Sequence, residues 1–306
     1  MENLTRRPAR RTAVALGYFD GVHLGHRRVL AAAAAAAAEK GLDSGVFTFV
    51  FGGENPIKGD AILSAAERRR RIAALGLDWY YCPDYDSFCG LEPEAFVAEI
   101  LLARMNAAEV FCGENFTFGR GGAGNVALLR ELCARHGVGV TVVEMAAADG
   151  SIVSSTRIRA LLLAGDVTEA NRLLGEPYAL CEPVVHGMAL GAKLGFPTIN
   201  QRYRPGMLLP QSGIYITRAT IGGKTYAAAT GLGDRPTVGG TDITCESFLI
   251  GFDGSLYGDD VRLEFFSRIA PVRRFDTLDE LRDCIAAAAR AAAAYFAGDA
   301  AAPRGL

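Results

Sequence analysis

The sequence predicts a fold of class α/β plus β: a parallel sheet covered by helices, followed by a small antiparallel β-barrel with one closing helix. Three observations support this. The 306 residues correspond to about two domains at roughly 150 residues each. Up to about residue 175, short apolar runs alternate with helix-length segments, as in β-α-β units. Beyond that point glycine and proline recur, and no long helix is expected before the C-terminal segment.

In the first part, apolar runs predict strands at 13–16, 46–51, 79–82, 109–112 and 138–143. Between and after them, helices are expected at 25–40, 64–75, 93–104, 124–136, 155–164 and 167–174. The alanine run 31–38 has high helix propensity and is assigned to the first helix. These elements alternate, so the strands should form a parallel sheet with helices on both faces.

In the second part, strands are expected at 213–221, 224–231, 244–252 and 261–268. Gly222-Gly223 and Asp253-Gly254 have the composition of hairpin turns. A closing helix at 277–296 follows Asp276-Thr277, a plausible N-cap. The change of pattern places a boundary near 176–183, which gives domains 1–176 and 180–306.

Composition excludes several classes of protein. The formal net charge of -2 provides no field that would attract nucleic acid or an anionic membrane. The longest apolar run, Val29 to Ala38, is too short to span a bilayer, and no signal-peptide core follows the N-terminal arginines. Seven scattered cysteines without a CxxC pair argue against both a disulfide framework and a zinc site. We therefore expect a cytoplasmic protein with small-molecule ligands, no nucleic acid and no membrane partner; homo-oligomerisation is compatible with the sequence.

The segment 17–26, Gly-Tyr-Phe-Asp-Gly-Val-His-Leu-Gly-His, ends the first strand and begins the first helix. Its two histidines, His23 and His26, lie three residues apart at a helix N-terminus, where free backbone N–H groups favour anions. A lone histidine there would be explained by capping and packing; a pair among only four histidines favours a phosphate site. The candidate phosphate-binding residues here are Gly17, Phe19, Asp20, Gly21 and Gly25.

This segment resembles the HxGH signature of the nucleotidylyltransferase superfamily. The resemblance implies a Rossmann-like sheet, catalytic histidines that contact a nucleoside triphosphate at its α-phosphate, and adenylyl or cytidylyl transfer. The superfamily's second signature, a Ser/Thr-rich turn with basic residues, resembles the segment 153–159, Val-Ser-Ser-Thr-Arg-Ile-Arg. Hydroxyls at a helix start can donate to phosphate oxygens, and a guanidinium suits leaving pyrophosphate. The corresponding candidates are Ser154, Ser155, Thr156, Arg157 and Arg159.

A glycine-bounded loop at 113–121 should lie at the carboxyl ends of the parallel strands, where open α/β sheets bind ligands. Asn115, Phe116 and Phe118 in this loop are candidate flavin contacts, although packing against the sheet explains each aromatic equally well. Together these segments resemble the FMN adenylyltransferase module of bacterial bifunctional flavin synthetases, over residues 12–175.

The segment 187–200 is glycine-rich, and its spacing matches neither the P-loop nor the dinucleotide fingerprint. It resembles the riboflavin kinase motif, a glycine-rich flap leading into Pro-Thr-x-Asn. The resemblance implies that Thr198 and Asn200 hold Mg²⁺, whose preferred ligands are hard oxygens. It also implies that Glu246 is the general base for the ribityl 5′-hydroxyl. Further residues that it implies are Gly191, Lys193 and Gly195 for ATP phosphates and Arg235 for flavin.

The two motif sets occur in the order typical of the bifunctional riboflavin kinase/FMN adenylyltransferase (FAD synthetase) family. This implies conversion of riboflavin to FMN and of FMN to FAD, with ATP as co-substrate in both steps. The chain departs from the family pattern at Glu182, usually glycine, and Gly231, usually asparagine, and it lacks the usual His-Pro pair after the second strand. These departures leave two alternatives open: a single retained activity, or a decayed flavin- or nucleotide-binding protein.

Overall fold

The computed structural model describes residues 1–52, 59–187, 191, 194–237 and 240–298, with the backbone alone at 234–237 and 240–243. The chain divides into two compact units. Unit 1 comprises Met1–Gly59 and Arg68–Ser155, and unit 2 comprises Asp60–Glu67 and Thr156–Leu306. A short segment of the first half of the sequence therefore belongs to the second unit.

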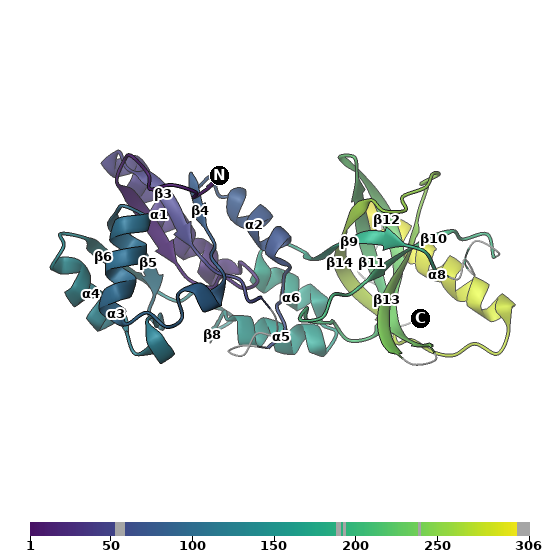
Figure 1. The fold of residues 1–306 in the computed structure, drawn as a ribbon. Coiled ribbons are helices and arrows are strands. Elements are labelled where there is room, and N and C mark those ends of the chain that lie inside the picture. Colours follow the sequence, from purple (N-terminus) through teal and green to yellow (C-terminus); the bar gives the residue numbers. More distant parts are fainter. Residues whose placement is uncertain (53–58, 188–190, 192–193, 238–239, 299–306) are drawn as a thin grey trace. The chain divides into compact units, whose positions relative to one another are not determined.

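Unit 1 contains a six-stranded sheet of order β1-β4-β3-β2-β5-β6 in which every pairing is parallel (Figure 1). Its strands are β1 (Glu2–Asn3), β2 (Thr12–Leu16), β3 (Asp43–Phe47), β4 (Trp79–Tyr81), β5 (Ala107–Gly113) and β6 (Gly139–Val143). A two-stranded hairpin, β7 (Ala147–Ala148) and β8 (Ser151–Ile152), precedes the end of the unit. All six strands of the large sheet point the same way, so their carboxyl ends share one edge.

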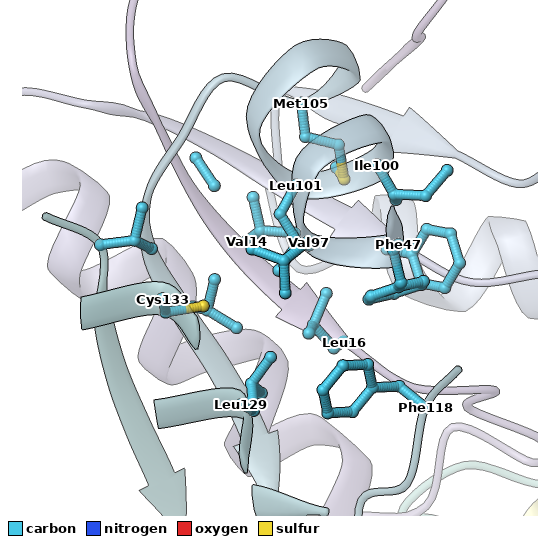
Figure 2. Close-up of a cluster of buried hydrophobic side chains, with 14 of the residues drawn as sticks. Val14, Leu16, Phe47, Val97, Ile100, Leu101, Met105, Phe118, Leu129 and Cys133 are labelled. Carbon is cyan, nitrogen blue, oxygen red and sulfur yellow. The ribbon is translucent and has the colours of Figure 1, made fainter. Parts of the chain in front are cut away.

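The helical segments here are α1 (Leu24–Lys40), α2 (Ala65–Ala73), η1 (Tyr85–Ser87), α3 (Pro93–Ala95), the π-helix η2 (Phe96–Arg104), η3 (Arg120–Gly122) and α4 (Val126–Ala134). Successive residues of β2 face opposite sides of the sheet. Figure 2 shows Val14 and Leu16 packed with Val97 and Leu101 of η2 and with Leu129 of α4. The alternate β2 residues are alanines, and the alanine-rich helix α1 contacts β2, β3 and β5. Small residues allow that close approach.

Unit 2 contains a closed antiparallel barrel of order β10-β13-β12-β11-β14-β9. Its strands are β9 (Tyr178–Val185), β10 (Thr198–Arg202), β11 (Gly213–Ile221), β12 (Lys224–Thr237), β13 (Gly240–Leu249) and β14 (Asp260–Ala270). The β11–β12 hairpin turns at Gly222 and Gly223, whose φ angles of 55° and 81° are those of a type I′ turn.

Helices α5, α6 and α8 and a strap also belong to the described part of unit 2. Helices α5 (Ser155–Leu163) and α6 (Val167–Leu174) precede β9, and α6 packs against β14 and β9. Helix α8 (Leu278–Ala297) begins at the N-cap Thr277 and packs on β11 and β12. The strap, residues 60–67, joins the barrel unit through Ala61, which forms two backbone hydrogen bonds with Gly206 and Leu208.

The predicted fold class is confirmed in both units, as is the closing helix. The strand expected at 46–51 instead spans Asp43–Phe47, so Phe49 and Phe51 lie beyond its end. The hairpin expected at Asp253-Gly254 is wrong, because β14 pairs with β11 and β9 and not with β13. Strands β1, β7, β8, β9 and β10 were not expected. Pro183 interrupts the β pattern of β9, and glycine and proline surround β10, so barrel pairing rather than local propensity determines both.

Candidate functional site

The turn after β2 has an unusual backbone. Phe19 and Val22 have positive φ angles of 54° and 46°, and Gly21 has φ 88°. Positive φ is strained for a β-branched residue such as Val22, and such strain costs about 1–3 kcal/mol where the surroundings enforce it. A Cβ at Gly17 would lie 3.0 Å from the Phe19 ring. The turn is therefore tightly specified by its glycines and by buried Phe19 and Val22.

His23 and His26 lie side by side at the start of α1. The Nδ1 of His23 accepts a hydrogen bond from the His26 backbone N–H at 3.3 Å, which makes His23 the N-cap. A neutral His23 therefore carries its proton on Nε2. The two rings stack at 3.6 Å between centroids with an interplanar angle of 18°. Helix N-termini favour anions, so this pair stands where a phosphate would be stabilised.

The Ser/Thr-rich segment lies against this turn. The Ser155 hydroxyl donates to the Asp20 carbonyl at 2.9 Å, and Gly25 lies close to the Val153 carbonyl. Helix α5 begins at Ser155, so Thr156, Arg157 and Arg159 occupy its first two turns in unit 2. Arg157 Nη2 lies 3.3 Å from Glu169, and Arg159 donates to the Asp60 carbonyl. The two motifs of the first site thus meet through Ser155 and Asp20.

The loop 113–121 follows β5 at the same edge of the sheet. Phe116 and Phe118 stack with centroids 6.0 Å apart and an angle of 9°. Phe118 is buried and belongs to the core cluster of Figure 2, whereas Phe116 is half-buried and Asn115 is exposed. Of the three candidate flavin contacts in this loop, Phe116 and Asn115 are thus the ones that a ligand can reach.

A row of half-buried aromatic residues, which we call the aromatic row, follows β2, β3 and β4 at the carboxyl edge. The rings of Tyr18 and Phe49 stack, with centroids 4.9 Å apart and an interplanar angle of 24°. The ring centroids of Phe51 and Tyr85 are 4.8 Å apart. The buried side chain of Arg68 donates hydrogen bonds to the backbone carbonyl oxygens of Tyr18 and Phe49. The members of the aromatic row are Tyr18, Phe49, Phe51, Tyr85 and Phe88. The aromatic row was not predicted from the sequence, because these residues are scattered over three segments.

In unit 2, the second set of candidate residues lies on β10 and β13. Asn200 is directly opposite Glu246, and Thr198 is directly opposite Phe248. Directly opposed residues of antiparallel strands project from the same face with close Cβ atoms. On the next strand, Gly231 is opposite Glu246. The hydroxyl-bearing Thr198, the amide of Asn200 and the carboxylate of Glu246 therefore share one face of the barrel wall.

That face borders a cavity of about 270 Å³ beneath helix α8. Thr198, Glu246 and Phe248 line it on the strand side. The helix contributes mainly apolar side chains, and the connection before it contributes Val272, Arg273 and Phe275. Aromatic and aliphatic linings with a few polar groups are typical of small-molecule sites. A Cβ at Gly231 would meet nothing within 4 Å, so the glycine leaves open space beside Glu246.

The chain that enters β10 approaches these side chains closely. A Cβ at Gly187 would lie 2.4 Å from Asn200 Nδ2, and one at Gly191 would lie 2.4 Å from the Phe196 carbonyl. Only glycine fits such contacts. Gly195 has φ 84°. Lys193 lies outside the described residues, and Arg235 is described by its backbone alone, in β12.

The departure at Glu182 forms an ion pair between a buried carboxylate and an exposed arginine. Glu182 is 2% exposed, and its carboxylate accepts from Nε of Arg204, whose side chain is 67% exposed, at 2.5 Å. Burial raises the pKa of Glu182, and the Arg204 hydrogen bond opposes that effect. The residue lies on β9 opposite Val261 and is outside the cavity lining.

In the described part of the chain, no helix is long and apolar enough to cross a membrane. Among the same residues, no group of three or more histidines, cysteines and acidic residues has the geometry of a metal site.

Comparisons with known proteins match both units. An FAD synthetase family model matches residues 5–157, and a riboflavin kinase model matches residues 174–296. A bifunctional riboflavin kinase/FMN adenylyltransferase of Bacillus subtilis is 32% identical over 96% of this chain and 95% of the relative. The Escherichia coli K12 protein of the same description is 30% identical, over 94% and 93%.

A solved structure described as a macrolide-efflux protein from Streptococcus pneumoniae has a TM-score of 0.82 and 30% identity, and the match covers 94% of this chain and 95% of that one. The family models and the curated relatives agree on two activities for the two units. The chain belongs to the family of bifunctional riboflavin kinase/FMN adenylyltransferases, enzymes that make FMN from riboflavin and FAD from FMN with ATP as co-substrate.

Proposed function

We propose that the kinase reaction takes place at the Glu246 face of the barrel, with riboflavin in the cavity under α8. The observation that carries this proposal is the cross-strand pair Asn200–Glu246, which borders an otherwise mainly apolar cavity. The isoalloxazine ring suits the apolar part. The ribityl 5′-hydroxyl then reaches Glu246, which accepts its proton as the oxygen attacks the γ-phosphorus of ATP, and ADP leaves.

Thr198 and Asn200 are the residues that would hold Mg²⁺. Their donor atoms are a hydroxyl and an amide oxygen, which suit a hard cation that also binds water and substrate phosphates. The glycines at 187 and 191 bring the backbone directly against Asn200 and Thr198, as the close approach of a backbone to a ligand site requires. Bound there, Mg²⁺ would neutralise charge on the transferring phosphoryl group.

For the adenylyltransferase we propose a site at the carboxyl edge of the unit 1 sheet. His23 and His26 would stabilise charge on the α-phosphate of ATP while an FMN phosphate oxygen attacks the α-phosphorus and pyrophosphate leaves. Ser154, Ser155 and Thr156 would donate to phosphate oxygens. The close approach of Ser155 to Asp20 supports one shared site for both motifs.

The remaining candidate residues of this site are proposed to bind the pyrophosphate of ATP and the flavin ring of FMN. Arg157 and Arg159 would bind the pyrophosphate, and Asn115 and Phe116 would contact the flavin. The aromatic row offers further ring surfaces at the same edge, and aromatic stacking prefers centroid distances of about 4.5–7 Å.

We also propose that the kinase part of the chain includes α5 and α6 and not only the residues after 180. Asn171 of α6 donates to the Phe265 carbonyl at 2.7 Å and accepts from the Tyr178 N–H at 2.6 Å. Tyr178 is fully buried and begins β9.

A cytoplasmic location is proposed because all seven cysteines are free thiols, as a reducing compartment maintains them.

Glu246→Gln tests the assignment of the kinase base. Loss of a general base costs about 10²–10⁴ in rate, so riboflavin phosphorylation should fall by that factor. Conversion of supplied FMN to FAD should continue, because the variant leaves unit 1 unchanged. The measurement is chromatographic separation of flavins after incubation with ATP and Mg²⁺. Asp260→Asn, an exposed barrel carboxylate outside the cavity lining, is the matched control.

Near-normal FMN formation by Glu246→Gln would remove Glu246 from the mechanism. A parallel loss in Asp260→Asn would indicate a general effect on the barrel instead. Wild-type protein that makes neither FMN nor FAD would contradict the assignment of both sites.

A further inference from the structure

Arg68, at the start of the run of four arginines in α2, is a buried cation whose described partners include no carboxylate. The residue is 3% exposed. Its Nη1 donates to the Tyr18 carbonyl at 3.1 Å, and its Nη2 donates to the Phe49 carbonyl at 2.6 Å. The guanidinium carbon lies 4.9 Å from the centre of the Tyr18 ring, and Nη2 lies 3.9 Å from Cys82 Sγ.

No carboxylate is among the described partners of Arg68. The preceding residue, Glu67, accepts two hydrogen bonds from Arg262, at 3.0 and 3.1 Å. Burial, more than any other cause, raises the pKa of Tyr80, which keeps that phenol neutral. Arg68 Nε is buried and has no hydrogen-bond partner in the described part of the chain. Burying a charge without an ionic partner is unfavourable.

The position of Arg68 links this charge to the adenylyltransferase site. Tyr18 belongs to the strained turn between β2 and α1 that also contains His23, and Phe49 follows β3. Both carbonyls that accept from Arg68 lie just beyond the carboxyl ends of neighbouring parallel strands, which is the edge where open α/β sheets bind ligands. The guanidinium therefore contacts the turn at which the phosphate groups are expected to bind.

We propose that Arg68 is an electrostatic positioning residue of the adenylyltransferase site. Its charge has no carboxylate partner among the described residues, and it is compensated when ATP and FMN bring their phosphates to the Gly17–His26 turn. The fork of hydrogen bonds to Tyr18 and Phe49 holds the turn and the aromatic row in place while this happens. The proposal rests on the adenylyltransferase site proposed above, and it adds a residue that acts without touching the reacting atoms.

The test uses the full-length enzyme with Arg68→Met and Arg68→Lys, and with Arg69→Met as the matched control. Arg69 is the next residue on the same helix and is exposed. KM and kcat for FMN and for ATP are measured in FAD formation. The melting temperature is measured with and without FMN plus a non-hydrolysable ATP analogue. Riboflavin phosphorylation by the same preparations reports whether the rest of the chain is intact.

In Arg68→Met we expect KM for FMN or ATP to rise about 10- to 100-fold. This is the change expected from losing the attraction between two unit charges that lie a moderate distance apart inside a protein. The ligand-induced rise in melting temperature should shrink accordingly. Arg68→Lys should recover most of the loss because it keeps the charge, although a lysine cannot reproduce the two-carbonyl fork. Arg69→Met and all kinase rates should match wild type.

Two results would overturn the proposal. One is an Arg68→Met enzyme with unchanged KM values and unchanged ligand-induced stabilisation. The other is an Arg68→Lys enzyme as impaired as Arg68→Met, which would show that the hydrogen-bond fork matters and the charge does not. If Arg68→Met does not fold, Arg68→Lys decides alone, since only the electrostatic role predicts near-normal KM values for it. Wild-type protein that cannot convert FMN would refute the proposed site instead.

Discussion

Replacement of Arg262 by methionine should destabilise unit 2 strongly, because the arginine pairs with two buried carboxylates. It lies 3.0 Å from Glu67 and 2.7 Å from Glu264, whose side chains are 1% and 7% exposed. Removing one partner of a buried ion pair typically costs about 3–5 kcal/mol. At about 2–4 °C per kcal/mol for a domain of this size, the melting temperature of unit 2 should fall by about 6–20 °C.

The assay is thermal unfolding followed by circular dichroism, and Arg218→Met is the control. Arg218 also pairs with Glu264, at 2.8 Å, but its side chain is 36% exposed, so its loss should cost about 1 kcal/mol or less. Glu67→Gln combined with Arg262→Met should lose less than the sum of the two single variants, because they disrupt one interaction. A loss below about 1 kcal/mol for Arg262→Met, or strict additivity, would refute the reasoning.

The same network has a predictable pH dependence. Burial alone would raise the pKa of Glu264, but hydrogen bonds from Arg218 and Arg262 outweigh it and hold the pKa below its ordinary value. A carboxyl with a lowered folded pKa contributes stability above its unfolded pKa, about 4.3. That contribution is lost as the pH falls through the folded pKa. The stability difference between wild type and Arg262→Met should therefore narrow on acidification below about pH 4.3.

Two further predictions concern single side chains. His23→Asn keeps a good N-cap for α1 and removes the imidazole. The rate of FAD formation should therefore fall by a factor of about 10²–10³, the scale of one lost oxyanion-type donor, while FMN accumulates from riboflavin. Undiminished FAD output would remove His23 from the mechanism. The difference in melting temperature between Glu182→Gln and wild type should shift in favour of the variant from pH 4.5 to pH 8. Burial raises the pKa of Glu182, so the wild-type group contributes stability only while protonated and loses it as pH rises; a pH-independent difference between Gln and Glu would contradict this.

Much of the fold could be predicted because it is encoded in short stretches of sequence. The alternation of apolar runs with helix-length segments predicted the parallel sheet, and Gly222-Gly223 predicted a hairpin that the structure contains. The histidine pair was also readable locally, since both residues lie within one turn of helix α1. Strands β9 and β10 were missed because the surrounding barrel, rather than their own composition, makes them strands.

The sequence by itself singled out the candidate catalytic and binding residues, through two local motifs and one glutamate matched by resemblance. Only the tertiary structure decided how they meet. Strand register sets Asn200 opposite Glu246, although they are 46 positions apart. The strap 60–67 joins the barrel unit, and Arg68 is buried behind the turn at Tyr18. These arrangements depend on contacts between distant segments, and long-range pairing leaves no local periodicity that a sequence reader could detect.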